Sequence, residues 1–212
     1  MTQNKAWYLQ QADLFKGISD EEIMQIAEKV VEKRCTKKEL IYSPFEPSSE
    51  ICLLKKGEVT LYHSHYGKKL IIEVLKPGSI FGNINFSNDN QSDHFAEVTE
   101  EAYICYFTVD DFMKVLQAKP EVMLRFLQMM SQRITEYEER IKSGLFDAKE
   151  KVLHHLEIIE KKNSKSFLGK IMRKKHLTHE ELAAHTGLSR ETVTRAIGAL
   201  KKEGKIPESL CD

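Results

Sequence analysis

The spacing of apolar residues changes several times along the 212-residue chain, and each change predicts a different kind of element. Ser19 and Glu22 form a capping box, a common start of a helix, and apolar residues follow at helical spacing. This pattern predicts a first helix over about residues 19–33. Its apolar positions are Ile23, Ile26, Ala27, Val30 and Val31.

From about residue 39 to residue 108 the chain instead contains short runs rich in β-branched and aromatic residues. The runs read ICLLKKG, EVTLYHSHYG, KKLIIEVLKPG and AEVTEEAYICYF. Gly57, Gly67 and Gly78 separate them at roughly ten-residue spacing, and Gly82 follows soon after. Short strands divided by glycine turns predict a β-sandwich or a barrel.

A long amphipathic helix is predicted from Pro120 to about Gly144, after a short helix that begins at Asp110. Six of its apolar residues are separated by 4, 3, 4, 3 and 4 positions, which is the a/d seam of a coiled coil. These residues are Met123, Leu127, Met130, Ile134, Tyr137 and Ile141. A second stripe can pack on the β-rich part of the same chain, and it consists of Val122, Phe126 and Met129. The seam predicts a homodimer, and the alternative is one broad stripe buried within a single chain.

A further helix is predicted where Asp147 and Glu150 form a cap, and it runs to about Glu160. The polar run KKNSKS at residues 161–166 predicts a loop after it. The charge balance changes in the same region. Residues 147–205 carry 14 Lys and Arg against 8 Asp and Glu, whereas residues 1–146 carry 18 against 22. A basic part joined to a mildly acidic body predicts that only the basic part meets a polyanion.

A helix-turn-helix is predicted near the end of the chain. Thr178 and Glu181 form a second capping box, and Gly187 supplies the positive-φ turn between two short helices. The predicted core residues are Leu182, Leu188, Val193 and Ile197, with small Ala183 where the helices cross.

The second of these helices begins at Ser189 and carries Arg190, Glu191, Thr192, Thr194 and Arg195 in its first turns. A recognition helix presents those turns to the major groove of double-stranded DNA. Arginine matches guanine O6 and N7, and glutamate can accept from cytosine N4. Phosphate contacts are expected from Thr178, Lys201 and Lys202. The predicted DNA-contacting set is therefore Thr178, Ser189, Arg190, Glu191, Thr192, Arg195, Lys201 and Lys202. The alternative is a pair of helices used only for packing.

Several function classes are excluded by what the sequence lacks. No apolar run approaches the ~20 residues that cross a bilayer, and the first residues lack the layout of a signal peptide. We therefore expect a cytoplasmic protein without a membrane partner. The four cysteines, Cys35, Cys52, Cys105 and Cys211, are too far apart for a zinc site or an iron–sulfur cluster, and buried packing is expected for the first three. No phosphate-binding glycine loop, H-E-x-x-H or G-x-S-x-G is present, so we do not expect an enzyme.

The stretch LTHEELAAHTGLSRETVTRAIGALKKEGKI resembles the helix-turn-helix of the cyclic-AMP receptor protein / fumarate-nitrate reductase regulator (CRP/FNR) family. LFKGISDEEI is similar to the opening helix of that family, and KKGEVTLY…GKKLIIEVLKPGSIFG to its cyclic-nucleotide-binding β-roll. The long seam helix resembles its dimerisation helix. The resemblance implies an α+β chain with three parts: an effector-sensing β-roll (jelly roll) over 1–118, a dimerisation helix over 119–145 and a helix-turn-helix domain of the winged-helix type over 146–212.

The resemblance also implies a homodimeric transcription regulator. The run S-R-E-T-V-x-R is similar to the subclass that reads palindromic TGTGA-type sites through positions matching Arg190, Glu191 and Arg195. RNA polymerase is a candidate partner on the same ground. After Ile206 only PESLCD remains, which is too short for the two-stranded wing of the family. A ligand-binding module whose helix-turn-helix no longer binds DNA is the competing hypothesis.

The residues that bind the nucleotide in cyclic-AMP-binding members differ here. Those members have Phe-Gly-Glu for the ribose, Arg-Ser or Arg-Thr for the cyclic phosphate, and Thr-Ser for the adenine. This chain has Asn83 for the glutamate, Asp93 and His94 for the Arg-Ser pair, and Tyr137 and Glu138 for Thr-Ser. Because a cyclic phosphate needs a cation and donors, cyclic AMP is not expected. The candidate effector pocket is Asn83, His94, Tyr137 and Glu138, and its effector is an unknown small molecule or none.

Haem is an alternative effector, through axial ligands offered by His63, His65 or His94. His63 and His65 precede the Tyr66-Gly67 turn and are expected to face solvent. The oxygen-sensing branch needs a cysteine cluster near its N-terminus, which this chain lacks.

Overall fold

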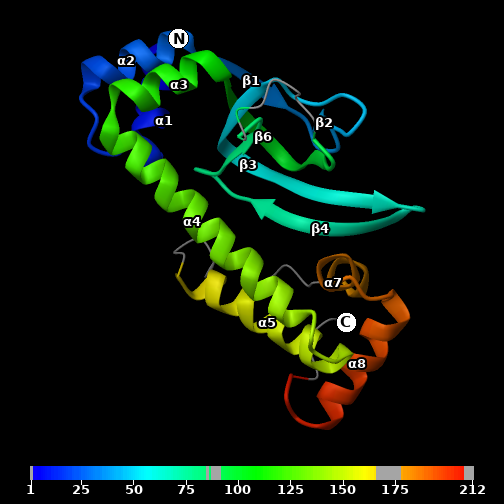
Figure 1. Ribbon diagram of the computed structural model, residues 1–212. Coiled ribbons are helices and arrows are strands. Elements are labelled where there is room, and N and C mark those ends of the chain that lie inside the picture. Colours follow the sequence, from blue (N-terminus) through cyan, green and yellow to red (C-terminus); the bar gives the residue numbers. More distant parts are fainter. Residues whose placement is uncertain (1, 85, 87–91, 166–177, 208–212) are drawn as a thin grey trace. The chain divides into compact units, whose positions relative to one another are not determined.

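The computed structural model describes residues 2–84, 86, 92–165 and 178–207 (Figure 1). They form two compact units, each described by itself below. The first contains Met1–Tyr66 and Ile71–Gln132, and the second contains Gly67–Leu70 and Arg133–Asp212. Helices and strands are both major parts of the chain, so the predicted α+β class is confirmed.

The first unit begins with helices that were predicted only in part. They are α1 (Thr2–Gln11), the single 3-10 turn η1 (Asp13–Phe15) and α2 (Asp20–Lys29). The capping box at the start of α2 is confirmed. The Glu22 backbone N–H donates to Ser19 Oγ at 3.4 Å, and the Ser19 N–H donates to Glu22 Oε2 at 3.1 Å. The predicted helix end was wrong, because Val31 already pairs with Tyr106 in the sheet. α1 was not predicted.

One six-stranded sheet forms the centre of the first unit, in the order β1-β6-β3-β4, with β2 paired to β6 and β5 paired to β3. The strands are β1 (Val31–Cys35), β2 (Leu40–Tyr42), β3 (Glu50–His65), β4 (Lys68–Leu75), β5 (Ile80–Gly82) and β6 (Phe95–Thr108). The long strands β3 and β6 are antiparallel, from Ile51 opposite Phe107 to Tyr62 opposite Phe95. The sheet confirms the β-rich region predicted from the short runs.

Gly57 does not end a strand, which corrects one of the predicted turns. It lies inside β3, so the runs ICLLKKG and EVTLYHSHYG are a single strand. Its φ is +89°, and a Cβ there would lie 2.1 Å from the backbone oxygen of Glu101. The β3–β6 register shifts on both sides of this glycine, as at a β-bulge. Gly67 is a turn as predicted, with positive φ at both Tyr66 and Gly67.

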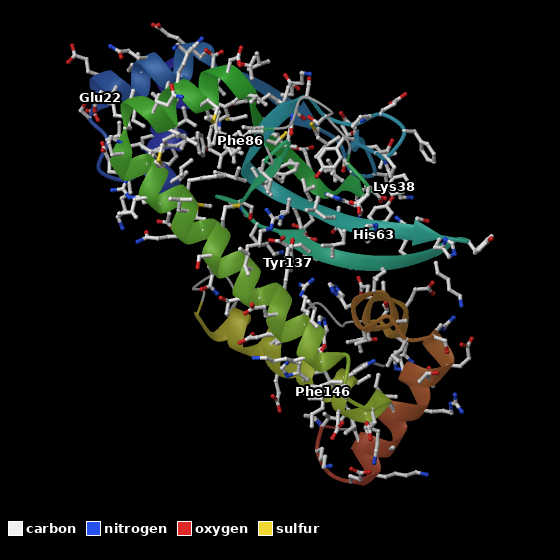
Figure 2. The ribbon with its side chains drawn as sticks, viewed as in Figure 1. Glu22, Lys38, His63, Phe86, Tyr137 and Phe146 are labelled. Atoms are coloured by element: carbon white, nitrogen blue, oxygen red, sulfur yellow. The ribbon has the colours of Figure 1, made fainter. Side chains whose placement is uncertain are left out.

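Two apolar clusters stabilise the first unit. One lies among the strands and includes Leu54, Val59 and Ile104. The other joins α1, α2 and α3 to the sheet and to the start of α4, and these helices gather at one side of the sheet in Figure 1. Phe86, labelled in Figure 2, stacks on Phe112 with ring centroids 6.3 Å apart in this second cluster.

Helices α3 (Val109–Ala118) and α4 (Pro120–Ser143) follow the sheet where they were predicted. Val122 and Phe126 of α4 are buried on the first unit, which confirms the second apolar stripe. The seam differs in its second half, because Met130 packs partly buried against the same core, whereas Ile134 is 59% exposed and Ile141 is 76% exposed. A single broad stripe buried within one chain is therefore not what this helix forms.

The second unit contains α5 (Ala148–Lys165), α7 (His179–Thr186) and α8 (Arg190–Lys202). Asp147 and Glu150 cap α5 as predicted, with two reciprocal bonds of 2.9 Å between backbone and carboxylate. α5 continues to Lys165, so the loop predicted at 161–165 was wrong, and residue 166 lies outside the described residues. Lysines are good helix formers, and the polarity of this run does not stop the helix. Val152 of α5 joins the core with the helix-turn-helix residues Leu182, Val193, Ile197 and Leu200.

Cys35, Cys52 and Cys105, the three cysteines within the described residues, are buried, as predicted, and their thiols are free. Burial raises the pKa of the Cys35 thiol. Cys211, and the predicted lack of a wing after Pro207, fall outside the described residues. Across the part of the chain that is described, none of the helices has the length and apolar character to cross a bilayer.

Candidate nucleic-acid interface

The first helix of the helix-turn-helix is held at its start by the predicted capping box. Thr178 Oγ1 accepts from the Glu181 backbone N–H at 3.2 Å, and the Thr178 N–H donates to Glu181 Oε2 at 2.9 Å. Thr178 is exposed, so its N-cap lies at the surface of the unit.

The turn between the helices has the predicted left-handed backbone. Gly187 has a φ of +70°, and its N–H donates to the Ala183 carbonyl at 2.9 Å. Ser189 then caps α8, and its Oγ accepts from the Thr192 backbone N–H at 3.2 Å. These local bonds define where α8 begins and which residues form its first turn.

The two sides of α8 differ sharply in burial. The buried side consists of Val193, Ala196, Ile197 and Leu200. Most of the predicted DNA-contacting residues of α8 are exposed: Arg190, Glu191, Arg195 and Lys202. Thr192 and Lys201 are half-buried, and Ser189 is exposed at the cap. The predicted base-reading residues therefore share the solvent-facing part of one rigid, capped helix.

Glu191 is held in its anionic form at this position. Its own backbone N–H and the Ser189 hydroxyl lower the pKa of the carboxyl group, and the Arg190 charge acts in the same direction. An ionised carboxylate only accepts hydrogen bonds. Such a group suits a donor such as the cytosine amino group better than a guanine or thymine acceptor.

Two residues outside the predicted set connect the helices at this surface. His179 Nδ1 lies 2.9 Å from Thr194 Oγ1, and Thr194 Oγ1 donates to the Arg190 carbonyl at 2.9 Å. The sequence offers only a weak signal for the second bond, a threonine four residues after Arg190. It offers none for the first, which joins residues fifteen positions apart.

The predicted effector residues Asn83 and His94 lie in the first unit. Asn83 is 7% exposed directly after β5, and its backbone N–H donates to the Glu50 carbonyl at 2.9 Å. His94 precedes β6, with Nε2 3.0 Å from Tyr42 Oη and Nδ1 3.1 Å from Asp93 Oδ1.

Tyr137 and Glu138, the other two predicted effector residues, lie on α4 in the second unit. The hydroxyl of Tyr137, labelled in Figure 2, accepts from Arg133 Nε at 3.1 Å. Glu138 is exposed.

The described residues near His94 do not fit a cyclic phosphate. A hydrogen bond from the His94 ring lowers the pKa of Asp93, so this carboxylate is anionic and repels a phosphate. Both ring nitrogens of His94 already have protein neighbours, which leaves neither nitrogen open for an anion. The ring nitrogen Nδ1 of His63 lies 3.1 Å from the Asp93 carbonyl at the surface, and His63 is partly exposed. His65 is exposed, as predicted.

Two family models match the chain. Residues 32–119 match the cyclic nucleotide-binding domain, and residues 151–209 match the Crp-like helix-turn-helix domain. The cyclic AMP receptor protein of Thermus thermophilus is 24% identical over 195 residues, which are 91% of this chain and 87% of that protein. The global nitrogen regulator of Synechococcus elongatus is 29% identical over 168 residues, 76% of this chain and 75% of that protein.

Solved structures share the fold. The regulator CLP of Xanthomonas campestris superposes with a TM-score of 0.73 at 14% identity, over 88% of this chain and 93% of that one. A CooA mutant of Carboxydothermus hydrogenoformans superposes with a TM-score of 0.66 at 22% identity, over 84% of this chain and 78% of that one. The two matched domains occur in the same chain, and the second holds the capped helix-turn-helix described above. This protein therefore belongs to the CRP/FNR family of transcription regulators and carries its helix-turn-helix DNA-binding domain.

Proposed function

We propose that this protein is a homodimeric regulator that reads palindromic TGTGA-like DNA sites and responds to an effector other than cyclic AMP. The observation that carries the proposal is the exposed set Arg190, Glu191 and Arg195 on the capped start of α8. The matched regulators of Thermus thermophilus and Synechococcus elongatus are bacterial, and by analogy we place this protein in the cytoplasm, with RNA polymerase as a partner of the DNA-bound dimer.

The base-reading roles follow from side-chain chemistry and helix geometry. Arg190 and Arg195 are five positions apart and point about 140° apart around the helix, so their long side chains can reach different base pairs. Each can bind guanine O6 and N7 with two hydrogen bonds, and Glu191 can accept from the cytosine paired to one of those guanines. Thr178, Lys201 and Lys202 contact phosphates, which fixes the position of the helix without reading sequence. Ser189 and Thr192 hold the first turn through their mutual hydrogen bonds.

Dimerisation is supported by the exposed seam of α4. Leu127, Ile134 and Ile141 are large apolar side chains that each present more than half of their surface to solvent. Their spacing matches a coiled-coil seam, and a second copy of the same helix buries them. A dimer carries two α8 helices, which suit half-sites about 34 Å apart on a palindrome.

The residues assigned to effector binding favour a ligand that has no cyclic phosphate. The anionic Asp93 and the engaged ring of His94 replace the cation and donors that a phosphate needs. Asn83 and His94, beside the sheet of the first unit, are the residues that we assign to effector binding. Tyr137 and Glu138 are separate candidates on α4 in the second unit. The same Tyr42 contact engages His94 Nε2, which disfavours His94 as an axial ligand of haem.

A binding selection on randomised duplexes tests the proposal with the wild type, Arg195→Ala and Lys202→Ala. We expect the wild type to select a palindrome with TGTGA-like arms. Arg195→Ala should lose about 1–3 kcal/mol and its preference at one base pair only. Lys202→Ala should weaken all sequences equally and reduce the salt slope by about one. A wild type that binds no duplex would favour the competing ligand-binding module, and one that binds all sequences equally would contradict the base-reading roles.

A further inference from the structure

The hydroxyl of Thr194 lies in a chain of two hydrogen bonds on the exposed side of α8. It donates to the Arg190 carbonyl at 2.9 Å and lies 2.9 Å from Nδ1 of His179, the first residue of α7. Thr194 is exposed, one turn after Arg190 and directly before Arg195. It therefore lies among the residues that we assign to base reading.

The number of available hydrogens decides which atom donates in the bond between His179 and Thr194. A threonine hydroxyl has one hydrogen, and here the Arg190 carbonyl receives it. The bond with His179 then requires the ring nitrogen Nδ1 to be the donor. Nε2 of His179 is buried and has no hydrogen-bond partner among the described residues, so a hydrogen there would be unsatisfied. Both observations agree on the tautomer with its hydrogen on Nδ1.

This arrangement limits what Thr194 can offer to DNA. Its only hydrogen is committed to the backbone, so the side chain cannot donate to guanine O6, guanine N7 or thymine O4. The hydroxyl oxygen is also engaged by His179. What remains for a base is the methyl group. In the major groove, the thymine C5 methyl is the apolar feature that distinguishes one base from the others.

We propose that Thr194 reads a thymine through methyl–methyl contact, and that His179 is the positioning residue that holds Thr194 in this orientation. The inference rests on the proposed function, because it needs α8 in the major groove. It adds Thr194 to the specificity-determining arginines and glutamate, together with the residue that positions it. A purely structural link between α7 and α8 is the competing explanation of the same two bonds.

Replacement of thymine by uracil in the selected duplex tests this directly, since uracil lacks only the C5 methyl. Each thymine of a half-site is replaced in turn, in both arms, and affinities are measured with the full-length protein. Loss of the contact with one buried methyl should weaken binding about fourfold in each arm, or about 16-fold for the whole palindrome. For the wild type we expect this loss at one thymine position of the half-site.

Variants at position 194 separate the methyl from the hydroxyl. Thr194→Val has a methyl in both branch positions of Cβ, so a methyl faces the base without the His179 bond and the uracil penalty should remain. Thr194→Ser keeps the hydroxyl and should bind thymine and uracil duplexes equally there. If the penalty is the same in wild type and Thr194→Ser, Thr194 does not read the methyl and the proposal is overturned.

Variants at position 179 test the positioning role. His179→Ala should reduce the thymine-to-uracil ratio although the Thr194 methyl is still present. His179→Asn should restore the ratio, because the asparagine amide can donate from nearly the position of Nδ1. If His179→Ala weakens both duplexes equally and leaves the ratio unchanged, His179 is only structural. If the wild type selects a sequence but shows no uracil penalty that depends on Thr194, only this inference is overturned. If the wild type selects no sequence, the proposed function itself is contradicted.

Discussion

Glu203 at the end of α8 is bound to Lys149 of α5, with 2.7 Å between Glu203 Oε1 and Lys149 Nζ. Its other oxygen, Oε2, lies 2.9 Å from Lys205 Nζ. The recognition helix is thus fastened at both ends, by the Ser189 cap at its start and by this ion pair at its end. An orientation held at both ends suits a helix whose side chains must match base edges.

The first prediction concerns the response of α8 to acid. The two lysine partners lower the pKa of Glu203 from 4.5 to about 2. A lowered pKa contributes stability that is present above pH 4.5 and is lost as the pH falls toward 2. Glu203→Gln should therefore lower the exchange protection of α8 amides near pH 6, and this difference should shrink below pH 4.5 and disappear as the pH falls through about 2. Hydrogen exchange measured by mass spectrometry checks it, and a difference that is independent of pH would contradict the ion-pair explanation.

The second prediction concerns Gly57 in the β3 bulge. Gly57→Ala forces a positive φ on alanine and places its Cβ 2.1 Å from the Glu101 oxygen. Gly78 also has positive φ, at +95°, but a Cβ at that position would meet no described atom within 4 Å, so Gly78→Ala is the matched control. We expect about 1–3 kcal/mol of destabilisation for Gly78→Ala and about 1–3 kcal/mol more for Gly57→Ala. Urea unfolding followed by the fluorescence of Trp7, the single tryptophan, measures both. If the two variants lose the same free energy of unfolding, the Glu101 backbone in β6 moves away from the new Cβ without a free-energy penalty.

The third prediction concerns the cap of α8. Ser189→Ala removes the acceptor of the Thr192 N–H and should cost about 1 kcal/mol, whereas Ser189→Thr should retain most of the cap. Because the Ser189 hydroxyl also lowers the pKa of Glu191, the alanine variant should raise that pKa toward its ordinary value. An NMR titration of Glu191 and thermal unfolding by circular dichroism measure the two effects. An unchanged Glu191 titration would mean that the hydroxyl does not reach the carboxylate in solution.

Features with local causes were the ones that the sequence could predict. The capping boxes at Ser19 and Thr178 involve residues three positions apart, and Gly187 is required by the backbone of a single turn. The exposed positions of Arg190, Glu191 and Arg195 on α8 follow from the cap at Ser189 and the helical period. These elements therefore need no knowledge of the rest of the fold.

Features that depend on distant parts of the chain were not predicted correctly. Val31 leaves the helical pattern because Tyr106 offers it a strand partner 75 residues later, and Gly57 is needed because the Glu101 backbone approaches it. The bond between His179 and Thr194 likewise exists only once α7 and α8 are packed. The periodicity and composition of the sequence do not show which distant residues become neighbours.

The fourth prediction is that cyclic AMP does not bind at physiological concentrations. The anionic Asp93 repels the phosphate, and the ring of His94 is engaged by Tyr42 and Asp93. Isothermal titration calorimetry should show only heat of dilution for the wild type. Asp93→Arg supplies the missing cation and should bind more tightly than the wild type. A micromolar constant for the wild type would show that other groups of the β-roll hold the phosphate without a guanidinium.

The last prediction is that the exposed seam of α4 forms a dimer. Ile134 is 59% exposed and sits in the middle of the 4-3-4-3-4 pattern, so two copies of Ile134→Glu place like charges in an apolar interface. This variant should be monomeric by light scattering at concentrations where the wild type is dimeric. Gln128→Glu adds the same charge at an exposed position outside the seam and should remain a dimer. Loss of the dimer should also weaken binding to a full palindrome far more than binding to an isolated half-site, because one α8 helix alone then engages the DNA. A wild type that is monomeric, or an Ile134→Glu variant that still dimerises, would mean that another surface joins the two copies.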